Sequence, residues 1–108
     1  MAVKQQFNSF EELLAGADGP LLVDFYAPWC GPCQIMAGVL ERVSPRLEGK
    51  ARIVKINTDN YPHLASRYQI SALPTLVLFR DGQPIRRLEG ALPDERLVQE
   101  VLAALKDA

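Results

Sequence analysis

The sequence predicts a three-layer α/β sandwich, in which a central mixed sheet carries helices on both faces. Segments with helical and strand patterns alternate along much of the chain, an order typical of α/β domains with parallel strands. Two short strands joined by a hairpin turn follow, and an amphipathic helix closes the chain. We therefore expect a parallel part of the sheet that an antiparallel hairpin completes at one side.

The composition is that of a single globular domain over residues 1–108. Of these residues 48% are hydrophobic and 23% are charged, and the formal net charge is −1. The balanced charge predicts no nucleic-acid partner, and no apolar run approaches the ~20 residues that cross a bilayer, which predicts no membrane partner. Residues 1–10 lack the positive and apolar regions of a secretory signal, so we expect none.

A short helix and a buried strand are expected first. Asn8 or Ser9 is suited to cap the helix, with Glu12 placed as in a capping box. The turn residues at 18–20 end the helix. Leu21–Tyr26 is a short, mostly apolar run between turn signals, which is typical of a strand buried on both faces.

The longest helix is expected to begin around the two cysteines and to run toward Leu47. Gly38 and Pro45 interrupt its pattern, so we expect a bend or a broken end. Its apolar residues recur at helical spacing, and they are Ile35, Met36, Val39, Leu40, Val43 and Leu47.

A second strand and a short helix are expected to follow. Arg52–Asn57 has the pattern of a strand. The short helix extends through Tyr68, with Pro62 suited to its first turn.

The end of the chain predicts a hairpin and a last helix. Leu76–Arg80 and Ile85–Glu89 read as strands around Asp81-Gly82, a strong signal for a tight hairpin turn. The last helix covers about Pro93–Lys106, with an apolar stripe and acidic residues in its first turn. The hairpin also carries Arg80, Arg86 and Arg87, for which a solvated face is favoured over a patch that steers acidic partners.

Chemistry is expected at Cys30 and Cys33, the two cysteines of the chain, which have two residues between them. A disulfide framework would need more cysteines spread along the sequence. A structural zinc site needs about four ligands, and the cysteines with the one histidine, His63, supply three at most. A pair with this spacing between a strand and a helix indicates a redox dithiol, without a metal or another cofactor.

The position of each cysteine predicts its role. Cys30 lies at the helix start, where unpaired N–H groups and the helix dipole stabilise a thiolate. We therefore expect Cys30 to be the exposed nucleophile and Cys33, one turn further on, to be the shielded resolving thiol. Gly31 and Pro32 between them carry no charge and no imidazole, which predicts a reductant rather than an oxidant.

The residues around the dithiol resemble the active site of thioredoxins, and the resemblance covers nearly the whole chain. Residues 29–33 read W-C-G-P-C, and they follow V-D-F-Y-A-P at 23–28. Leu73-Pro74-Thr75 and Gly90-Ala91 are similar to two further active-site segments of the family, at the usual separations. The resemblance implies a protein-disulfide reductase that reacts with its targets through a mixed disulfide at Cys30.

Asp24 and Lys55 are charged residues within apolar strands. Burial of a carboxylate is costly unless it is partnered or protonated, so we expect a raised pKa for Asp24. The residues alone leave open a purely structural pair. The resemblance implies that Asp24 relays a proton to or from Cys33 and that Lys55 modulates it.

Pro74 precedes a strand, and the residues alone favour an ordinary trans proline. The resemblance instead implies a cis proline that packs against the dithiol, with the Leu73 backbone pairing with a substrate strand. It also implies a flat apolar docking surface, formed by Trp29, Gly31, Pro32, Ala72, Leu73, Gly90 and Ala91.

Several departures place the sequence nearer to one subgroup, the y-type (Q-type) thioredoxins of plastids and cyanobacteria. This resemblance implies a monomer reduced by thioredoxin reductase, ferredoxin-dependent or NADPH-dependent, with targets such as peroxiredoxins and methionine sulfoxide reductases. The location it implies is the cytoplasm of a cyanobacterium. The second choice is the chloroplast stroma, where the sequence would be the mature form of the protein. The departures from common thioredoxin sequences are Tyr26, Gln34, Gly38, Ala72 and Glu89.

Two other functions remain as alternatives. The docking surface could serve a redox-independent binding subunit, which would keep its function without cysteines. The two cysteines could instead hold a [2Fe–2S] cluster between two chains, in which case the protein would be coloured.

Overall fold

The predicted alternation of helices and strands is confirmed in the computed structural model, which describes residues 10–107. A first helix covers residues 10–16. The residues expected to cap it, Asn8 and Ser9, lie outside the described part. The other elements are β1 (Leu21–Tyr26), α2 (Gly31–Leu47), β2 (Arg52–Asn57), α3 (Pro62–Arg67), β3 (Thr75–Arg80), β4 (Gln83–Glu89) and α4 (Asp94–Asp107).

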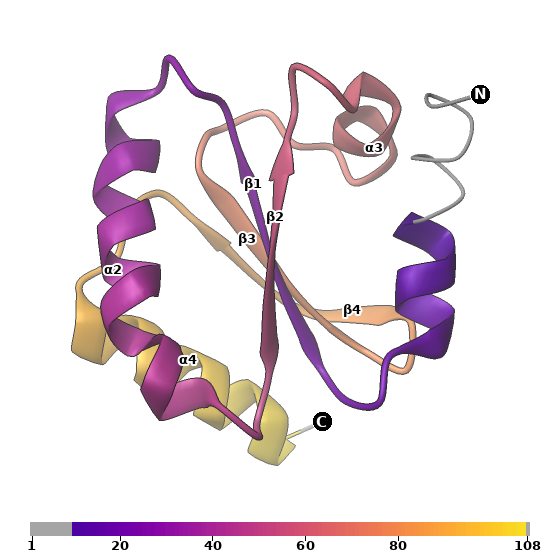
Figure 1. The fold of residues 1–108 in the computed structure, drawn as a ribbon, viewed down its shortest axis with the longest axis vertical. Helices are drawn as coiled ribbons and strands as arrows, with labels where there is room; N and C mark the ends of the chain where they lie inside the picture. Colours follow the sequence, from indigo (N-terminus) through magenta and orange to yellow (C-terminus); the bar gives the residue numbers. More distant parts are fainter. Residues whose placement is uncertain (1–9, 108) are drawn as a thin grey trace.

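The sheet of the described residues has the strand order β2-β1-β3-β4 (Figure 1). β1 runs parallel to β2 and antiparallel to β3, and β3 pairs with β4 in an antiparallel hairpin. The sheet is therefore mixed, as predicted. β1 lies between two neighbours, and its carboxyl end leads directly into the segment with the cysteines.

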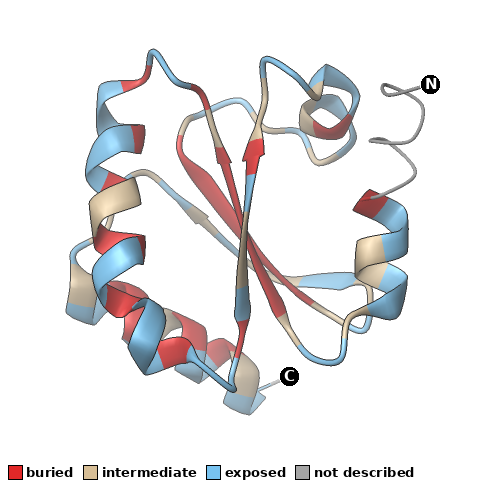
Figure 2. Ribbon diagram, viewed as in Figure 1, coloured by how far each residue is buried: buried red, intermediate tan, exposed pale blue. Residues whose placement is uncertain are grey.

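Helices cover both faces of this sheet, which gives the three layers. Figure 1 shows α2 and α4 on one side and α3 with the first helix on the other. Two apolar clusters fill the spaces between the layers, one under α2 and α4 and one under the first helix and α3. β1 and β3 are buried between them (Figure 2), as predicted for Leu21–Tyr26.

Helix α2 is continuous from Gly31 to Leu47. Of the expected bend or broken end, the broken end is therefore wrong, and the bend stays a prediction. Pro45 lies in the last turn of the helix, where the missing N–H removes one hydrogen bond close to the end. Ile35 belongs to the apolar helical pattern of the sequence, but this residue is 64% exposed. Met36, Val39 and Leu40 are buried and form the face toward the sheet, and Ile35 lies just outside that stripe.

Replacement of Ile35 by alanine is therefore expected to change the free energy of unfolding by less than about 0.5 kcal/mol. The matched control on the same helix is Leu40→Ala, which removes a buried side chain and is expected to cost about 2–5 kcal/mol. Urea denaturation of both variants measures the difference. Similar losses in the two variants would contradict the exposure of Ile35.

The hairpin strands are longer than the pattern predicted. Thr75 pairs with Glu89 at the start of β3, and Pro84 pairs with Phe79 beside an irregularity in the ladder. A proline is tolerated there because β4 is an edge strand of the described sheet. Asp81 and Gly82 both have positive φ, +54° and +79°, as a tight hairpin turn of this kind requires.

The three arginines of the hairpin contact different elements rather than forming one solvated group. Arg80 donates to the Leu105 carbonyl, and Arg86 forms an ion pair with Glu100 on α4. Arg87 instead faces the segment after α3, where it donates to two backbone carbonyls. None of the described helices has the length and apolar character needed to cross a membrane.

Candidate active site

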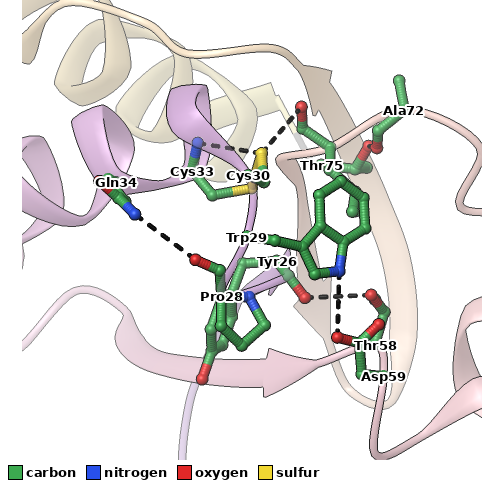
Figure 3. The surroundings of a disulfide bond; sticks show 11 residues. Tyr26, Pro28, Trp29, Cys30, Cys33, Gln34, Thr58, Asp59, Ala72 and Thr75 are labelled. Carbon is green, nitrogen blue, oxygen red and sulfur yellow. Dashed lines mark hydrogen bonds between the residues drawn. A yellow bond between two sulfur atoms is a disulfide. The ribbon is translucent and has the colours of Figure 1, made fainter.

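Cys30 and Cys33 form a disulfide at the start of α2 (Figure 3). Cys30 is the N-cap of the helix, and the backbone N–H of Cys33 donates to its Sγ atom at 3.2 Å. Both residues are buried, with 6% and 3% of their surface exposed, so the expectation of an exposed Cys30 is wrong, whereas Cys33 is shielded as predicted. Cys30 is covered because Ala27 and Leu73 pack in the same cluster. An N–H group directed at Sγ of Cys30 stabilises a thiolate there once the disulfide is reduced.

The Leu73-Pro74 peptide bond is cis, and the loop that contains it lies beside the dithiol. Sγ of Cys30 is 3.7 Å from the Leu73 carbonyl oxygen, a distance at which the reduced thiol can donate a weak hydrogen bond. The hydroxyl of Thr75 donates to the Ala72 carbonyl at 2.6 Å, and the N–H of Gly90 donates to the Pro74 carbonyl at 2.9 Å. Three segments that are far apart in the sequence therefore meet at the cysteines.

Trp29 is the most exposed large apolar side chain of the described residues, at 72%. Its indole N–H donates to the carboxylate of Asp59 at 3.1 Å (Figure 3). The backbone N–H of Asp59 donates in turn to Asn57 Oδ1. The hydrogen bond connects the exposed ring to the segment that follows β2. The sequence reasoning missed Asp59. Its position just after β2 is the signal that could have found it, because the carboxyl ends of parallel strands meet at one edge.

Gln34 lies on the other side of the dithiol, in the second turn of α2. Its side-chain amide donates to the Pro28 carbonyl at 3.4 Å (Figure 3). This contact joins the helix to the loop that precedes Cys30.

Asp24 is fully buried in the centre of β1, and neither carboxylate oxygen has a hydrogen-bond partner. It pairs in register with Lys55 on β2 and with Leu76 on β3. Because Leu22 and Leu76 belong to the cluster under α2 and α4, strand alternation places the Asp24 side chain on the same face as α2. Burial raises the pKa of Asp24 from 3.8 to about 6, against an opposing effect of the Lys55 charge.

Lys55 is exposed, and it does not hydrogen-bond to Asp24. Its ammonium group lies 4.9 Å from the centre of the Tyr26 ring, a distance typical of a cation–π contact. Lys55 therefore affects Asp24 through its charge alone, and its head group stays in water above the aromatic ring.

The fold and this site define a class of proteins, the dithiol–disulfide oxidoreductases with a cysteine pair at a helix N-terminus. The thioredoxin family model matches residues 1–103, and the chain belongs to the thioredoxin family. This membership supports a thiol–disulfide reductase function, which the Cys30–Cys33 pair can carry.

Individual relatives agree with this membership. The chain is 55% identical over 101 residues to a thioredoxin-like protein of Synechocystis, covering 94% of this chain and 96% of the relative. It is 52% identical over 107 residues to the chloroplastic thioredoxin Y of rice, covering 99% of this chain. It is also 52% identical over 105 residues to the chloroplastic thioredoxin Y1 of Arabidopsis, covering 97% of this chain. The chain spans 64% and 61% of the length of these two plant proteins.

Proposed function

We propose that this protein reduces disulfide bonds in other proteins, with Cys30 as the nucleophile and Cys33 as the resolving thiol. The observation that carries the proposal is the environment of Cys30. Its Sγ atom caps α2, accepts the Cys33 N–H and lies beside the cis-proline loop. A thiolate at this position is stabilised by the helix start and is adjacent to a backbone segment that can hold a substrate strand.

The reaction transfers two electrons in two exchanges. The Cys30 thiolate attacks one sulfur of the target disulfide, and the other target sulfur leaves as a thiolate. The Cys33 thiolate then attacks Sγ of Cys30 in the mixed disulfide, which releases the first target sulfur. The target is reduced to a dithiol, and the protein is left with the Cys30–Cys33 disulfide.

Asp24 serves as the proton acceptor or donor for Cys33 in this scheme. The support is its full burial on the α2 face of the sheet and its lack of any hydrogen-bond partner. A pKa of about 6 keeps both protonation states accessible near neutral pH. Lys55 modulates Asp24 by lowering that pKa through its charge.

Targets bind to the docking surface formed by Trp29, Gly31, Pro32, Ala72, Leu73, Gly90 and Ala91. Most of these residues are exposed around a dithiol that is itself nearly covered. An extended target segment is expected to pair with the Leu73 backbone, because main-chain pairing suits an enzyme that accepts many sequences. Pro74 in its cis form holds that backbone toward Cys30.

The partners follow from the same proposal. Relatives in a cyanobacterium and in chloroplasts are consistent with both locations expected from the sequence. We place the protein in a cyanobacterial cytoplasm, with the chloroplast stroma as the alternative. It receives electrons from a ferredoxin-dependent or an NADPH-dependent thioredoxin reductase. Its targets include peroxiredoxins and methionine sulfoxide reductases.

Reduction of insulin disulfides tests this function. The wild-type protein is expected to accelerate insulin precipitation with dithiothreitol, and with one of the two reductases as electron source. The Cys30→Ser/Cys33→Ser double variant is expected to lose all of this activity. Equal activity of the wild type and the double variant would overturn the reductase function and leave the redox-independent binding subunit.

A further inference from the structure

Arg87, on the edge strand β4, binds two carbonyl groups that follow α3. Its Nη1 group donates to the Tyr68 carbonyl and its Nη2 group to the Gln69 carbonyl, both at 2.6 Å. One guanidinium group thereby holds two consecutive peptide units. Arginine can do this because its N–H donors are fixed in a planar fork.

These carbonyls belong to a turn that ends α3. Gln69 has φ +54°, and the N–H of Ile70 donates to the Ala65 carbonyl at 2.8 Å, the pattern of a Schellman motif. A residue other than glycine or asparagine is uncommon in this conformation. The two hydrogen bonds from Arg87 hold the turn in place, and the positive charge is favourable at the carboxyl end of a helix.

The segment that starts at this turn is the loop of the docking surface. Residues 70–74 lead from the turn through Ala72 and Leu73 to the cis proline. The far end of the loop is held by the bonds of Thr75 to Ala72 and of Gly90 to Pro74. Arg87 holds its near end.

The same guanidinium group also contacts the second segment of the docking surface. Nε of Arg87 donates to the carboxylate of Glu89 at 3.0 Å, and Glu89 directly precedes Gly90. The arginine keeps this carboxylate paired beside an otherwise apolar surface, and it links the 89–91 segment to the loop at 70–74.

We propose that Arg87 is a positioning residue that fixes the geometry of the docking surface for protein targets. The proposal rests on the proposed function, because it concerns how targets bind to that surface. Arg87 does not touch the dithiol, so its removal should weaken target binding without changing the reactivity of Cys30. Loss of preorganisation in a binding loop is expected to lower affinity rather than to alter the chemical step.

The test compares a protein disulfide with a small one. Arg87→Ala is expected to raise KM for insulin about fivefold with kcat nearly unchanged, since ordering one loop costs on the order of 1 kcal/mol. Its rate with 5,5′-dithiobis(2-nitrobenzoate), which needs no extended docking segment, is expected to equal that of the wild type. Arg87→Lys keeps the charge but cannot form the fork, so it is expected to behave like Arg87→Ala. Glu89→Gln is expected to raise KM less.

Arg86→Ala is the matched control. Arg86 is the preceding residue on the same strand and also binds a carboxylate, but it faces α4. All variants are assayed at a temperature where circular dichroism shows them folded. If Arg87→Ala does not fold, Arg87→Lys and Glu89→Gln test the positioning role in its place. An unchanged KM for insulin in the Arg87 variants, or an equal loss with both substrates, would overturn the positioning role. Failure of the wild type to reduce insulin would instead overturn the proposed function.

Discussion

Replacing Cys33 by serine is expected to leave the protein covalently attached to its targets through Cys30. The variant retains Cys30 at the N-cap of α2, and the backbone N–H of residue 33 still faces its Sγ atom. The first exchange therefore proceeds. The second exchange needs a thiolate at position 33, which serine does not supply. Each molecule is therefore expected to react once, forming one mixed disulfide with its target, and catalytic turnover with insulin should fall to the uncatalysed rate.

Non-reducing electrophoresis followed by mass spectrometry measures the adduct and locates it on Cys30. The matched control is Cys30→Ser, which is expected to show neither turnover nor adduct, because Cys33 lies one turn inside α2, whereas Cys30 caps the helix and lies beside the Leu73 loop. Adducts in the Cys30→Ser variant but not in Cys33→Ser would reverse the two roles. Turnover of Cys33→Ser at the wild-type rate would remove the resolving step from the mechanism.

Replacing Asp24 by alanine is expected to change how the stability of the oxidised protein depends on pH. In the wild type, the pKa of Asp24 is about 6 when folded and near 3.8 when unfolded. Between these values the folded state binds more protons than the unfolded state, so its free energy of unfolding falls as the pH rises. This destabilisation is absent below pH 3.8 and complete above pH 6. At its full extent it lowers the free energy of unfolding by about 3 kcal/mol.

The measurement is the difference in the free energy of unfolding between Asp24→Ala and wild type, from urea titrations at several pH values. This difference is expected to move by about 3 kcal/mol in favour of the variant between pH 3.5 and pH 7.5. The cavity left by the smaller side chain changes the free energy of unfolding by the same amount at every pH, so it does not affect how the difference varies with pH. Parallel stability curves for the two proteins would show that Asp24 titrates normally in the folded state.

The same variant is expected to reduce insulin more slowly, because in the proposed mechanism Cys33 then lacks its proton acceptor. Asp24→Asn serves as the second variant, since it keeps the shape of the side chain without the titrating group. Both should show reduction rates with an altered dependence on pH between 6 and 9. Rates that match the wild type across this range would leave Asp24 with a structural role alone.

The apolar patterns of the sequence were sufficient to predict most of the fold. β1 and β2 have the predicted limits, Leu21–Tyr26 and Arg52–Asn57, because short apolar runs between turn residues leave little freedom in register. The start of β3 at Thr75 could not be predicted, since it depends on pairing with Glu89 across the hairpin. The helical spacing of apolar residues also includes the exposed Ile35, because a period of 3.6 residues does not show where the buried stripe ends.

The candidate site was predictable where chemistry depends on local sequence. The spacing of Cys30 and Cys33 at a strand-to-helix junction indicated the dithiol, and a carboxylate in an apolar run indicated the raised pKa of Asp24. The contacts of Asp59 with Trp29 and of Arg87 with the turn after α3 join distant segments. Such contacts depend on the packing of the whole domain, and no local pattern encodes them.

The turn at Asp81-Gly82 has a practical consequence for studying this protein. β3 runs antiparallel to β1, and Phe79 pairs with Leu21, so this turn lies at the end of the sheet opposite the one that leads to Cys30. Exposed loop tips of this kind tolerate insertions better than other sites. A fluorophore, an affinity peptide or a tether to a surface can therefore be built into this tip, which leaves the face that meets partner proteins free for single-molecule and capture experiments.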